Sequence, residues 1–345
     1  MRGELSVPSE ALESALSNNN CFNGKRMRSK AIWITWESQV RNRSISRNLG
    51  IRLFELNYGG ARLIRYGVCL YKTASLLIRE RPSVIFSSNP SIVLALFLLH
   101  MKALFRYRYI IDAHFIGVMA YEKGQAFQRI LDYCNRTADM VIVTNSEHAD
   151  HVTKIGGKAF VCEDPLPEFP DGIARIEKGQ GKWVFFICSF DADEPYKEVF
   201  EAAKYLLKDG FTFYVSGNYA KAEIKPEDYP YIKFLGYVPY STFYSYLISC
   251  DVVMDLTSCD NCLICGAYEA MAAEKALVTS NTEAIRNYFT HGAVYTDHQP
   301  EDMAKAIRIA YNNRDRVPDE IRQWKTVARR NLLEKIAVLK KYADM

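Results

Sequence analysis

Short apolar runs alternate along this chain with longer stretches in which apolar residues recur every three or four positions. The short runs are rich in valine and isoleucine, which is typical of strands buried on both faces of a parallel sheet. The longer stretches have the period of an amphipathic helix. Strands that alternate with helices in this way predict βαβ units, in which helices cover both faces of a parallel sheet.

The same pattern places the individual elements. In the first half of the chain, strands are expected at 31–36, 83–86, 109–112 and 140–144, and helices at 61–80, 91–105 and 126–137. In the second half, strands are expected at 183–187, 212–215, 232–234, 252–255, 276–279 and 293–295. Helices in that half are expected at 197–208, 240–249, 266–273, 282–288, 300–312 and 319–342. The two sets predict two Rossmann-like domains of similar size.

A proline-rich segment separates the two sets of elements. Pro165, Pro167 and Pro170 lie so close together that neither a helix nor a central strand can continue through them. The first residues of the chain lack apolar periodicity, which predicts a disordered tail. We therefore expect a tail at 1–29, a first domain at 30–165, a linker at 166–182, a second domain at 183–318 and a closing helix at 319–345.

The composition of the chain indicates the cellular compartment in which the protein is expected. Hydrophobic residues make up 49% of the chain and charged residues 24%, which is globular usage. The longest apolar run, at 92–99, is shorter than the about 20 residues that a membrane-spanning helix needs. The N-terminus lacks the apolar core of a secretory signal. Nine cysteines form an odd set, which favours a reducing compartment over a disulfide framework. We therefore expect a cytoplasmic protein.

Basic residues are concentrated in the first half of the chain. Residues 1–165 carry 22 Lys and Arg against 14 Asp and Glu, whereas residues 166–345 carry 22 against 26. No nucleic-acid motif accompanies this charge, so no nucleic-acid partner is expected. An anionic membrane surface or a phosphorylated substrate fits the basic half, and so does an unevenly charged solvated surface. Basic and aromatic residues interleave at 101–109, which is typical either of a peripheral membrane contact or of a core helix with a charged end.

The segment 255–273 combines a strand, a polar loop and a helix. Backbone N–H groups at the start of such a helix can bind phosphate, because the helix dipole places about half a positive charge there. Glu269 stands about one turn into the helix. Its carboxylate can accept two hydrogen bonds from a vicinal diol such as that of ribose, or it can simply complement the helix dipole.

Three motifs in this region carry a family resemblance. Gly-Ala-Tyr-Glu-Ala-Met-Ala at 266–272, Ala-Leu-Val-Thr-Ser at 276–280 and Ala-Ile-Arg-Asn-Tyr-Phe at 284–289 resemble the donor-binding segment of retaining GT-B glycosyltransferases of family 4, in a bacterial polysaccharide-associated branch. The resemblance implies an α/β GT-B fold, in which two Rossmann-like domains face each other across a cleft and the C-terminal helix crosses back to the first. It also implies a nucleotide-diphosphate sugar as donor and a saccharide or lipid-linked acceptor. Transfer would proceed with retention and without a metal or other cofactor.

The resemblance further assigns donor-binding roles to single residues of the second domain. Glu269 would bind the ribose. Lys197 would neutralise the diphosphate in place of an arginine that the family carries nearby, unless it is only an exposed lysine of the first helical turn. The other donor-binding residues that the resemblance implies are Ser189, Gly217, Tyr237, Val238, Cys262, Leu263, Ile264 and Cys265.

Three residues are expected to orient the donor sugar. His114 ends a predicted strand of the first domain, where the family places a histidine that hydrogen-bonds the sugar. The first glutamate of the family's Glu-x7-Glu motif falls at Asn261, which keeps a hydrogen-bonding side chain but no charge, and Asp260 stands beside it as a substitute. The lost charge favours one alternative, a catalytically impaired scaffold with a binding or regulatory role. A non-hydrolysing sugar-nucleotide epimerase, which shares the architecture, is another.

Two further features have competing interpretations. The expected loop after the first strand contains Arg41 and Arg43, whose guanidinium groups could bind an anionic acceptor such as a lipid diphosphate or could be solvated surface charges. Cys259, Cys262 and Cys265 have the spacing of zinc or iron–sulfur ligands, but no fourth ligand is apparent. We therefore expect no bound metal, with a cysteine-ligated metal protein as the alternative.

Overall fold

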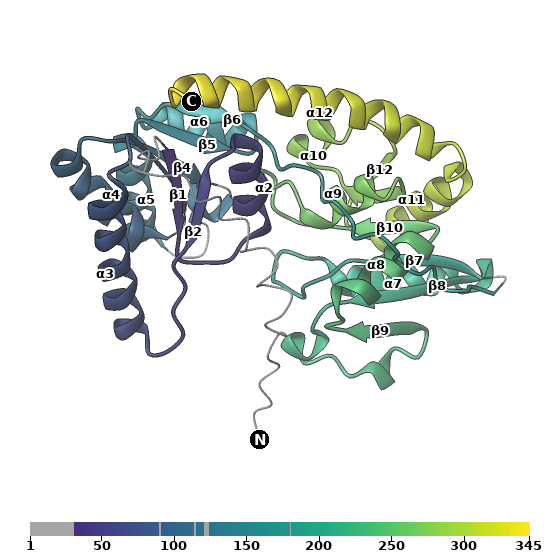
Figure 1. Cartoon of the computed structure of the whole chain (residues 1–345). Coiled ribbons are helices and arrows are strands. Elements are labelled where there is room, and N and C mark those ends of the chain that lie inside the picture. The colour runs from purple at the N-terminus through teal and green to yellow at the C-terminus, as the bar shows by residue number, and fades with distance from the viewer. Residues whose placement is uncertain (1–30, 90, 114, 121–123, 180) are drawn as a thin grey trace.

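Two parallel six-stranded sheets, each flanked by helices, form the described part of the chain (Figure 1). The computed structural model describes residues 31–345 except for residues 90, 114, 121–123 and 180. The predicted tail at 1–29 and the candidate residue His114 lie outside these described residues. The two sheets with their helices confirm the predicted α/β class with two Rossmann-like domains.

The first sheet has the strand order β2-β1-β3-β4-β5-β6. Its strands are β1 (Ala31–Thr35), β2 (Arg52–Glu55), β3 (Val84–Asn89), β4 (Arg108–Ala113), β5 (Met140–Val143) and β6 (Ala159–Val161). The α-helices of this half are α2 (Val40–Leu49), α3 (Arg62–Glu80), α4 (Ile92–Phe105), α5 (Gln125–Thr137) and α6 (Ser146–Lys154).

The second sheet has the strand order β12-β11-β10-β7-β8-β9. Its strands are β7 (Lys182–Phe186), β8 (Phe211–Ser216), β9 (Ile232–Gly236), β10 (Val252–Asp255), β11 (Ala276–Ser280) and β12 (Ala293–Thr296). The α-helices of this half are α7 (Tyr196–Leu206), α8 (Tyr240–Ser249), α9 (Cys265–Ala272), α10 (Glu283–Tyr288), α11 (Pro300–Asn313) and α12 (Val317–Tyr342).

Sequence periodicity located every strand and α-helix of the second half but missed α2, β2, α6 and β6 in the first. The two strands are short strands at the edges of the sheet, and none of the residues of β2 and β6 is fully buried. The two helices are short and polar, so that only a few of their apolar residues face the core. Such elements are too short or too polar to show a distinct apolar pattern in the sequence. The region predicted as a loop that carries Arg41 and Arg43 is therefore helix α2.

Successive residues of β1 pack into cores on opposite faces of the first sheet. Ile32 and Ile34 belong to one buried cluster. Trp33 belongs to another, where its ring stacks on Phe86 with the ring centroids 5.4 Å apart. Leu339 of α12 completes this second cluster. The alternation follows from the two-residue period of a strand, and it explains why β1 is apolar at each of its first four positions.

Helix α12 runs from the second domain back across the first (Figure 1). Near its start, Trp324 donates a hydrogen bond of 2.9 Å to the carbonyl of Tyr288 in the second domain. Near its end, the Lys335 ammonium lies 2.6 Å from the carboxylate of Glu163, and Arg108 donates to the carbonyl of Tyr342. The helix therefore joins both domains, as the predicted crossing helix should.

The basic and aromatic segment at 101–109 comprises the end of α4 and the start of β4. Tyr107 and Tyr109 are buried, and Arg108 is engaged with the C-terminal segment through Tyr342 and Asp344. These two aromatic side chains thus face the core, which favours the interpretation as a core helix with a charged end. Among the described helices, none has the length and apolarity that crossing a bilayer requires.

Candidate functional site

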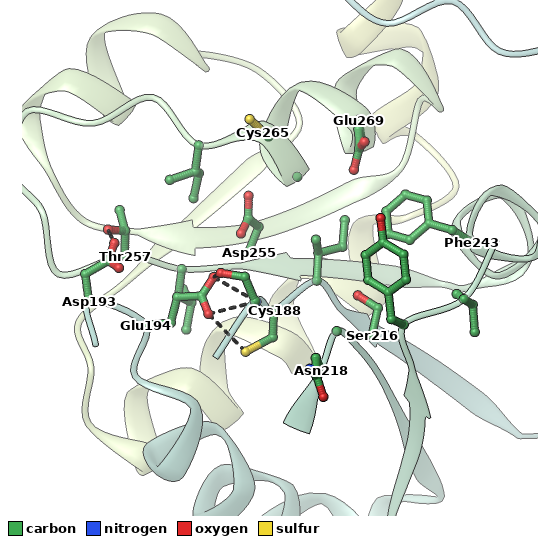
Figure 2. A pocket seen from close by; sticks show the side chains of 18 of the residues that line it. Cys188, Asp193, Glu194, Ser216, Asn218, Phe243, Asp255, Thr257, Cys265 and Glu269 are labelled. Carbon is green, nitrogen blue, oxygen red and sulfur yellow. Dashed lines mark hydrogen bonds between the residues drawn. The ribbon is translucent and has the colours of Figure 1, made fainter. Parts of the chain in front are cut away.

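A pocket of about 680 Å³ lies beyond the carboxyl ends of β7, β8, β9 and β10. The strand order places β7, the first strand of its sheet along the chain, between β8 and β10. The connections from β7 and β10 therefore diverge at this point, and such a topological switch point is where open parallel sheets bind ligands. Figure 2 shows side chains from the loops after these strands turned towards this space.

A close backbone approach forms the floor of the pocket. Gly217 has φ of +101°, and a Cβ atom on it would lie 1.8 Å from the carbonyl oxygen of Cys188. Only glycine adopts this conformation without strain and leaves room for the neighbouring strand end. Gly217 lines the pocket, as predicted from the strand end that it occupies.

Glu194 organises the turn after β7. Its carboxylate accepts hydrogen bonds from the backbone N–H of Ser189 at 2.9 Å and of Asp191 at 3.1 Å, and also from the Ser189 hydroxyl. Phe190, inside this turn, has a positive φ of 60°, a strained conformation for a side chain of its size. Ser189 lines the pocket as predicted, but its N–H and O–H groups are already engaged with protein carboxylates. Its role in the free protein is therefore to shape the turn.

Asp193 joins the two loops that form this side of the pocket. Its carboxylate accepts a 2.7 Å hydrogen bond from the Thr257 hydroxyl, and its backbone carbonyl accepts one of 2.7 Å from the N–H of Ser258. The loop after β7 is thereby tied to the loop after β10. The side chains of Asp193 and Glu194 were not among the site residues predicted from the sequence. The acidic pair Asp193-Glu194, placed directly between a strand and a helix, was the available signal.

Replacing Thr257 by valine keeps the shape of the side chain but removes this hydrogen bond. We expect the free energy of unfolding to fall by about 1–2 kcal/mol, because the carboxylate of Asp193 loses a partner. Chemical denaturation measures the change. Thr153, an exposed residue of α6 that bonds only to its own helix, is the matched control, and Thr153→Val should change stability by less than about 0.5 kcal/mol. Equal effects in the two variants would contradict the cross-loop role.

Asp255, the last residue of β10, caps the start of α9. Its buried carboxylate accepts a hydrogen bond of 2.8 Å from the N–H of Ala267 and a second from the N–H of Gly266. A Cβ atom on Gly266 would lie 2.6 Å from this carboxylate, so the helix can start here only with glycine. Burial, reinforced by the charges of Glu194 and Glu269, holds the pKa of Asp255 well above its ordinary value. Two of the N–H groups that were expected to face a phosphate are thus used inside the protein.

Glu269 projects from α9 into the pocket (Figure 2). Burial raises the pKa of its carboxyl group from an ordinary value of 4.5 to about 7. Among the described residues, no group hydrogen-bonds to this carboxyl group. It therefore differs from the carboxylates of Asp193, Glu194 and Asp255, each of which serves the protein's own loops. A half-buried acceptor that faces a cavity without a partner is suited to bind hydroxyl groups of a ligand.

The opposite wall of the pocket comes from the segment after β9 and the start of α8. Tyr237, Val238, Tyr240 and Phe243 line it. Tyr237 is 86% exposed, so its ring is available for stacking against a planar ligand. Tyr237 and Val238 were both predicted as donor-binding residues, and the structure places them on this wall.

The loop before α9 completes the pocket. The predicted residues Cys262, Leu263, Ile264 and Cys265 all line it. Burial raises the pKa of the Cys262 thiol well above its ordinary value, so this thiol is neutral near pH 7, whereas Cys265 is exposed. The described residues contain no group of three or more side chains placed to hold a metal ion, and this includes the three cysteines of the loop.

Among the described residues, no lysine, arginine or histidine lines the pocket. Lys197, predicted as the cation that faces a diphosphate, is exposed in the first turn of α7 and is not among the lining residues. The nearby Lys221 is ion-paired with Asp191. The charged side chains that line the pocket are thus the carboxyl groups of Asp193, Glu194, Asp255 and Glu269.

Two of the three residues predicted to orient a sugar lie in the described part of the chain, and neither lines this pocket. Asp260 is exposed, and neither Asp260 nor Asn261 lines it. The backbone carbonyl of Asn261 instead accepts a 2.9 Å hydrogen bond from the side chain of Asn145, at the end of β5 in the first domain. Asn261 therefore lies where the two domains meet.

Arg41 has a structural role in place of the predicted acceptor contact. Its guanidinium group bonds to both carboxylate oxygens of the buried Asp112, to Asp164 at 2.6 Å and to the carbonyl of Cys162. These contacts join α2, β4 and the segment that leads out of the first domain. Arg43 is partly exposed on α2, where it forms a bidentate pair with Glu55 at 2.9 Å. Neither arginine is left as a free cation.

Part of the chain matches one family model, and the whole chain is similar to several solved structures. Residues 181–313 match the family model described as "Glycosyl transferases group 1". Anabaena HepE, solved in complex with UDP-glucose, is similar in structure with a TM-score of 0.65 at 13% identity, over 90% of this chain and 99% of HepE. Sucrose-phosphate synthase of Thermosynechococcus elongatus has a TM-score of 0.64 at 12% identity, over 91% of this chain and 96% of its own.

A third similar structure belongs to a different class of enzyme. The UDP-GlcNAc 2-epimerase of Methanocaldococcus jannaschii has a TM-score of 0.55 at 12% identity, over 82% of this chain and 92% of its own. No curated protein matches the chain in sequence. The structural similarities establish the GT-B arrangement of two Rossmann-like domains, and the segment that matches the family model contains the residues that line the pocket.

Proposed function

We propose that this chain, whose residues 181–313 match the group 1 glycosyltransferase model, moves a sugar from a nucleotide diphosphate to a saccharide or lipid-linked acceptor. The nucleotide sugar binds in the pocket of the second domain, and the acceptor binds to the first domain across the cleft. Transfer proceeds with retention at the anomeric carbon and without a metal ion.

Glu269 is the observation that carries this proposal. Its carboxyl group faces the pocket at the switch point of the sheet and has no described protein partner. A carboxylate in this position can accept hydrogen bonds from both hydroxyls of a ribose ring. The aromatic wall that contains Tyr237 lies across the pocket and suits a nucleobase. HepE, a structural neighbour, is solved with UDP and with UDP-glucose, which makes uridine the first base to test.

The diphosphate would then lie against the loop that contains Cys262 and Cys265. Since no basic side chain lines the pocket, backbone N–H groups and the dipole of α9 are the sources of positive potential available there. Their alignment would stabilise the charge that develops on the leaving diphosphate. Asn261 stands at the contact with the first domain. In this proposal it orients the donor sugar together with Asp260 and His114.

Thermal unfolding in the presence of nucleotides tests the donor site. A ligand at about 100 times its dissociation constant stabilises the folded state by roughly 2.7 kcal/mol, which is visible as a shift in Tm. We expect one nucleoside diphosphate, and its sugar conjugates, to raise Tm selectively. No shift with UDP, GDP, ADP or their sugar derivatives, in a folded preparation, would refute the proposed donor site.

Product analysis then separates the three functional classes. A transferase forms a glycosylated product only when an acceptor extract is added. An epimerase converts the nucleotide sugar without an acceptor. A scaffold without catalysis binds the nucleotide sugar and leaves it unchanged, which is the alternative that Asn261 favours.

A further inference from the structure

The outer face of α3 carries a row of exposed apolar side chains. Ile64, Tyr71 and Ile78 are spaced seven residues apart and are 57%, 74% and 62% exposed, and Leu63 beside them is 85% exposed. The inner face of the same helix is packed into the core of the first domain through Cys69, Leu76 and Leu77, among others. No other described helix exposes as many large apolar side chains. Single exposed apolar residues are ordinary, but a continuous row marks a contact surface.

Basic residues flank this row along its whole length. Arg65, Lys72 and Arg79 each follow one residue after a member of the row, so they repeat at the same seven-residue interval along one side of it. Residues 56–79 contain no Asp or Glu. Glu80, at the end of the helix, is largely covered and pairs with Arg52 and Arg79. Neither Arg65 nor Lys72 forms an ion pair with a described carboxylate.

The position of α3 leaves the cleft free. The helix follows the edge strand β2, so it starts at the edge of the first sheet where the strands have their carboxyl ends. Figure 1 shows α3 on the side of the first domain that faces away from the second. A flat partner bound to this side would touch neither the pocket nor the contact between the domains.

We propose that this α3 face, made of Leu63, Ile64, Tyr71 and Ile78 with Arg65 and Lys72, docks the protein on an anionic lipid bilayer. Apolar side chains that enter the head-group region, beside cations that meet lipid phosphates, are the two components of interfacial binding. The seven-residue spacing would also suit a second copy of this helix. That occupant is disfavoured because the face has no carboxylate to pair with the cations of a partner helix. The proposal is independent of the donor site.

Vesicle co-sedimentation of the full chain tests this docking. The wild type should bind vesicles of phosphatidylcholine mixed with phosphatidylglycerol, but not pure phosphatidylcholine, and added salt should weaken the binding. The double variant Arg65→Gln/Lys72→Gln should bind the mixed vesicles about 25-fold more weakly, since each cation near an anionic surface contributes about fivefold. Tyr71→Ser/Ile78→Ser should also bind at least about tenfold more weakly, because less apolar surface enters the interface.

Helix α12 supplies matched controls. Arg329→Gln/Arg330→Gln and Leu333→Ser/Val338→Ser change exposed residues of the same chemical kinds on that helix and should leave binding unchanged. Equal losses in the α3 and α12 variants, or no binding of the wild type to mixed vesicles, would overturn the proposal. So would a dimer, seen by light scattering, that Tyr71→Ser/Ile78→Ser converts to a monomer. Binding of nucleoside diphosphates to the same variants reports separately on the proposed donor site.

Discussion

The Glu269→Ala variant is expected to bind its nucleotide sugar on the order of 100-fold more weakly than the wild type. The variant removes a charged acceptor for two hydroxyls of the ligand, and each hydrogen bond to a charged group contributes about 1.5–3 kcal/mol. The variant should fold normally, because the carboxyl group of Glu269 has no described partner to lose and its burial disfavours the charged form. Calorimetric titration with the nucleotide selected by thermal unfolding measures the affinity.

Two further variants test whether the loss of affinity is specific to the carboxylate of Glu269. Glu269→Gln keeps the size of the side chain and one acceptor oxygen, so it should fall between the wild type and Glu269→Ala. Lys197→Ala changes an exposed residue of the neighbouring α7 that does not line the pocket, and it should bind as the wild type does. A Glu269→Ala variant with wild-type affinity would show that the ribose does not bind at this carboxyl group.

The pKa of Glu269 adds a pH dependence to donor binding. With a pKa of about 7 in the free protein, the group is partly protonated near neutrality. A protonated carboxyl group accepts fewer hydrogen bonds, so affinity should rise as the pH increases from about 6 to about 8 and then level off. The pH dependence of folding stability has the opposite sign to that of donor affinity. Because the folded-state pKa is raised, this group contributes stability below pH 4.5 that is lost as the pH rises through about 7.

The Arg41→Ala variant is expected to lose about 3–5 kcal/mol of folding free energy. Arg41 is 8% exposed and Asp112 is fully buried, and the two side chains share three hydrogen bonds of 2.7–3.1 Å. Removing one partner of a buried ion pair leaves the other charge desolvated without compensation, and this cost dominates the effect. The loss of the bond to Asp164 also loosens the segment that leaves the first domain. Chemical denaturation followed by circular dichroism measures the change.

The neighbouring Arg43 provides a control on the same helix. Its pair with Glu55 is largely solvent-exposed on the arginine side, and exposed ion pairs contribute about 0–1 kcal/mol. Arg43→Ala should therefore destabilise the protein by less than about 1 kcal/mol. The double variant Arg41→Leu/Asp112→Leu should be more stable than Arg41→Ala, because it removes the stranded charge. Equal losses for Arg41→Ala and Arg43→Ala would contradict the buried-pair explanation.

Periodicity in the sequence was sufficient to locate the strands and α-helices of the second domain. Its mid-sheet strands β7, β10 and β11 are buried and carry apolar runs, and its edge strands β9 and β12 are also mostly apolar. The residues of the pocket loop at 262–265 and Glu269 could also be located, because they follow a strand and open a helix in a motif that resembles the family's. In the first domain, β2 and β6 could not be found, since they are only four and three residues long.

Only the tertiary structure decided which polar residues serve the site and which serve the fold. Arg41 lies 71 residues before Asp112 and 123 before Asp164, and no local pattern connects them. Likewise, Glu194 and Asp193 hold the pocket loops together, while Lys197, three residues after Glu194, is exposed and is not among the residues that line the pocket. A side chain's role depends on the partners that the fold brings within about 3 Å of it. Local sequence determines the element on which a residue lies, but long-range packing determines those partners.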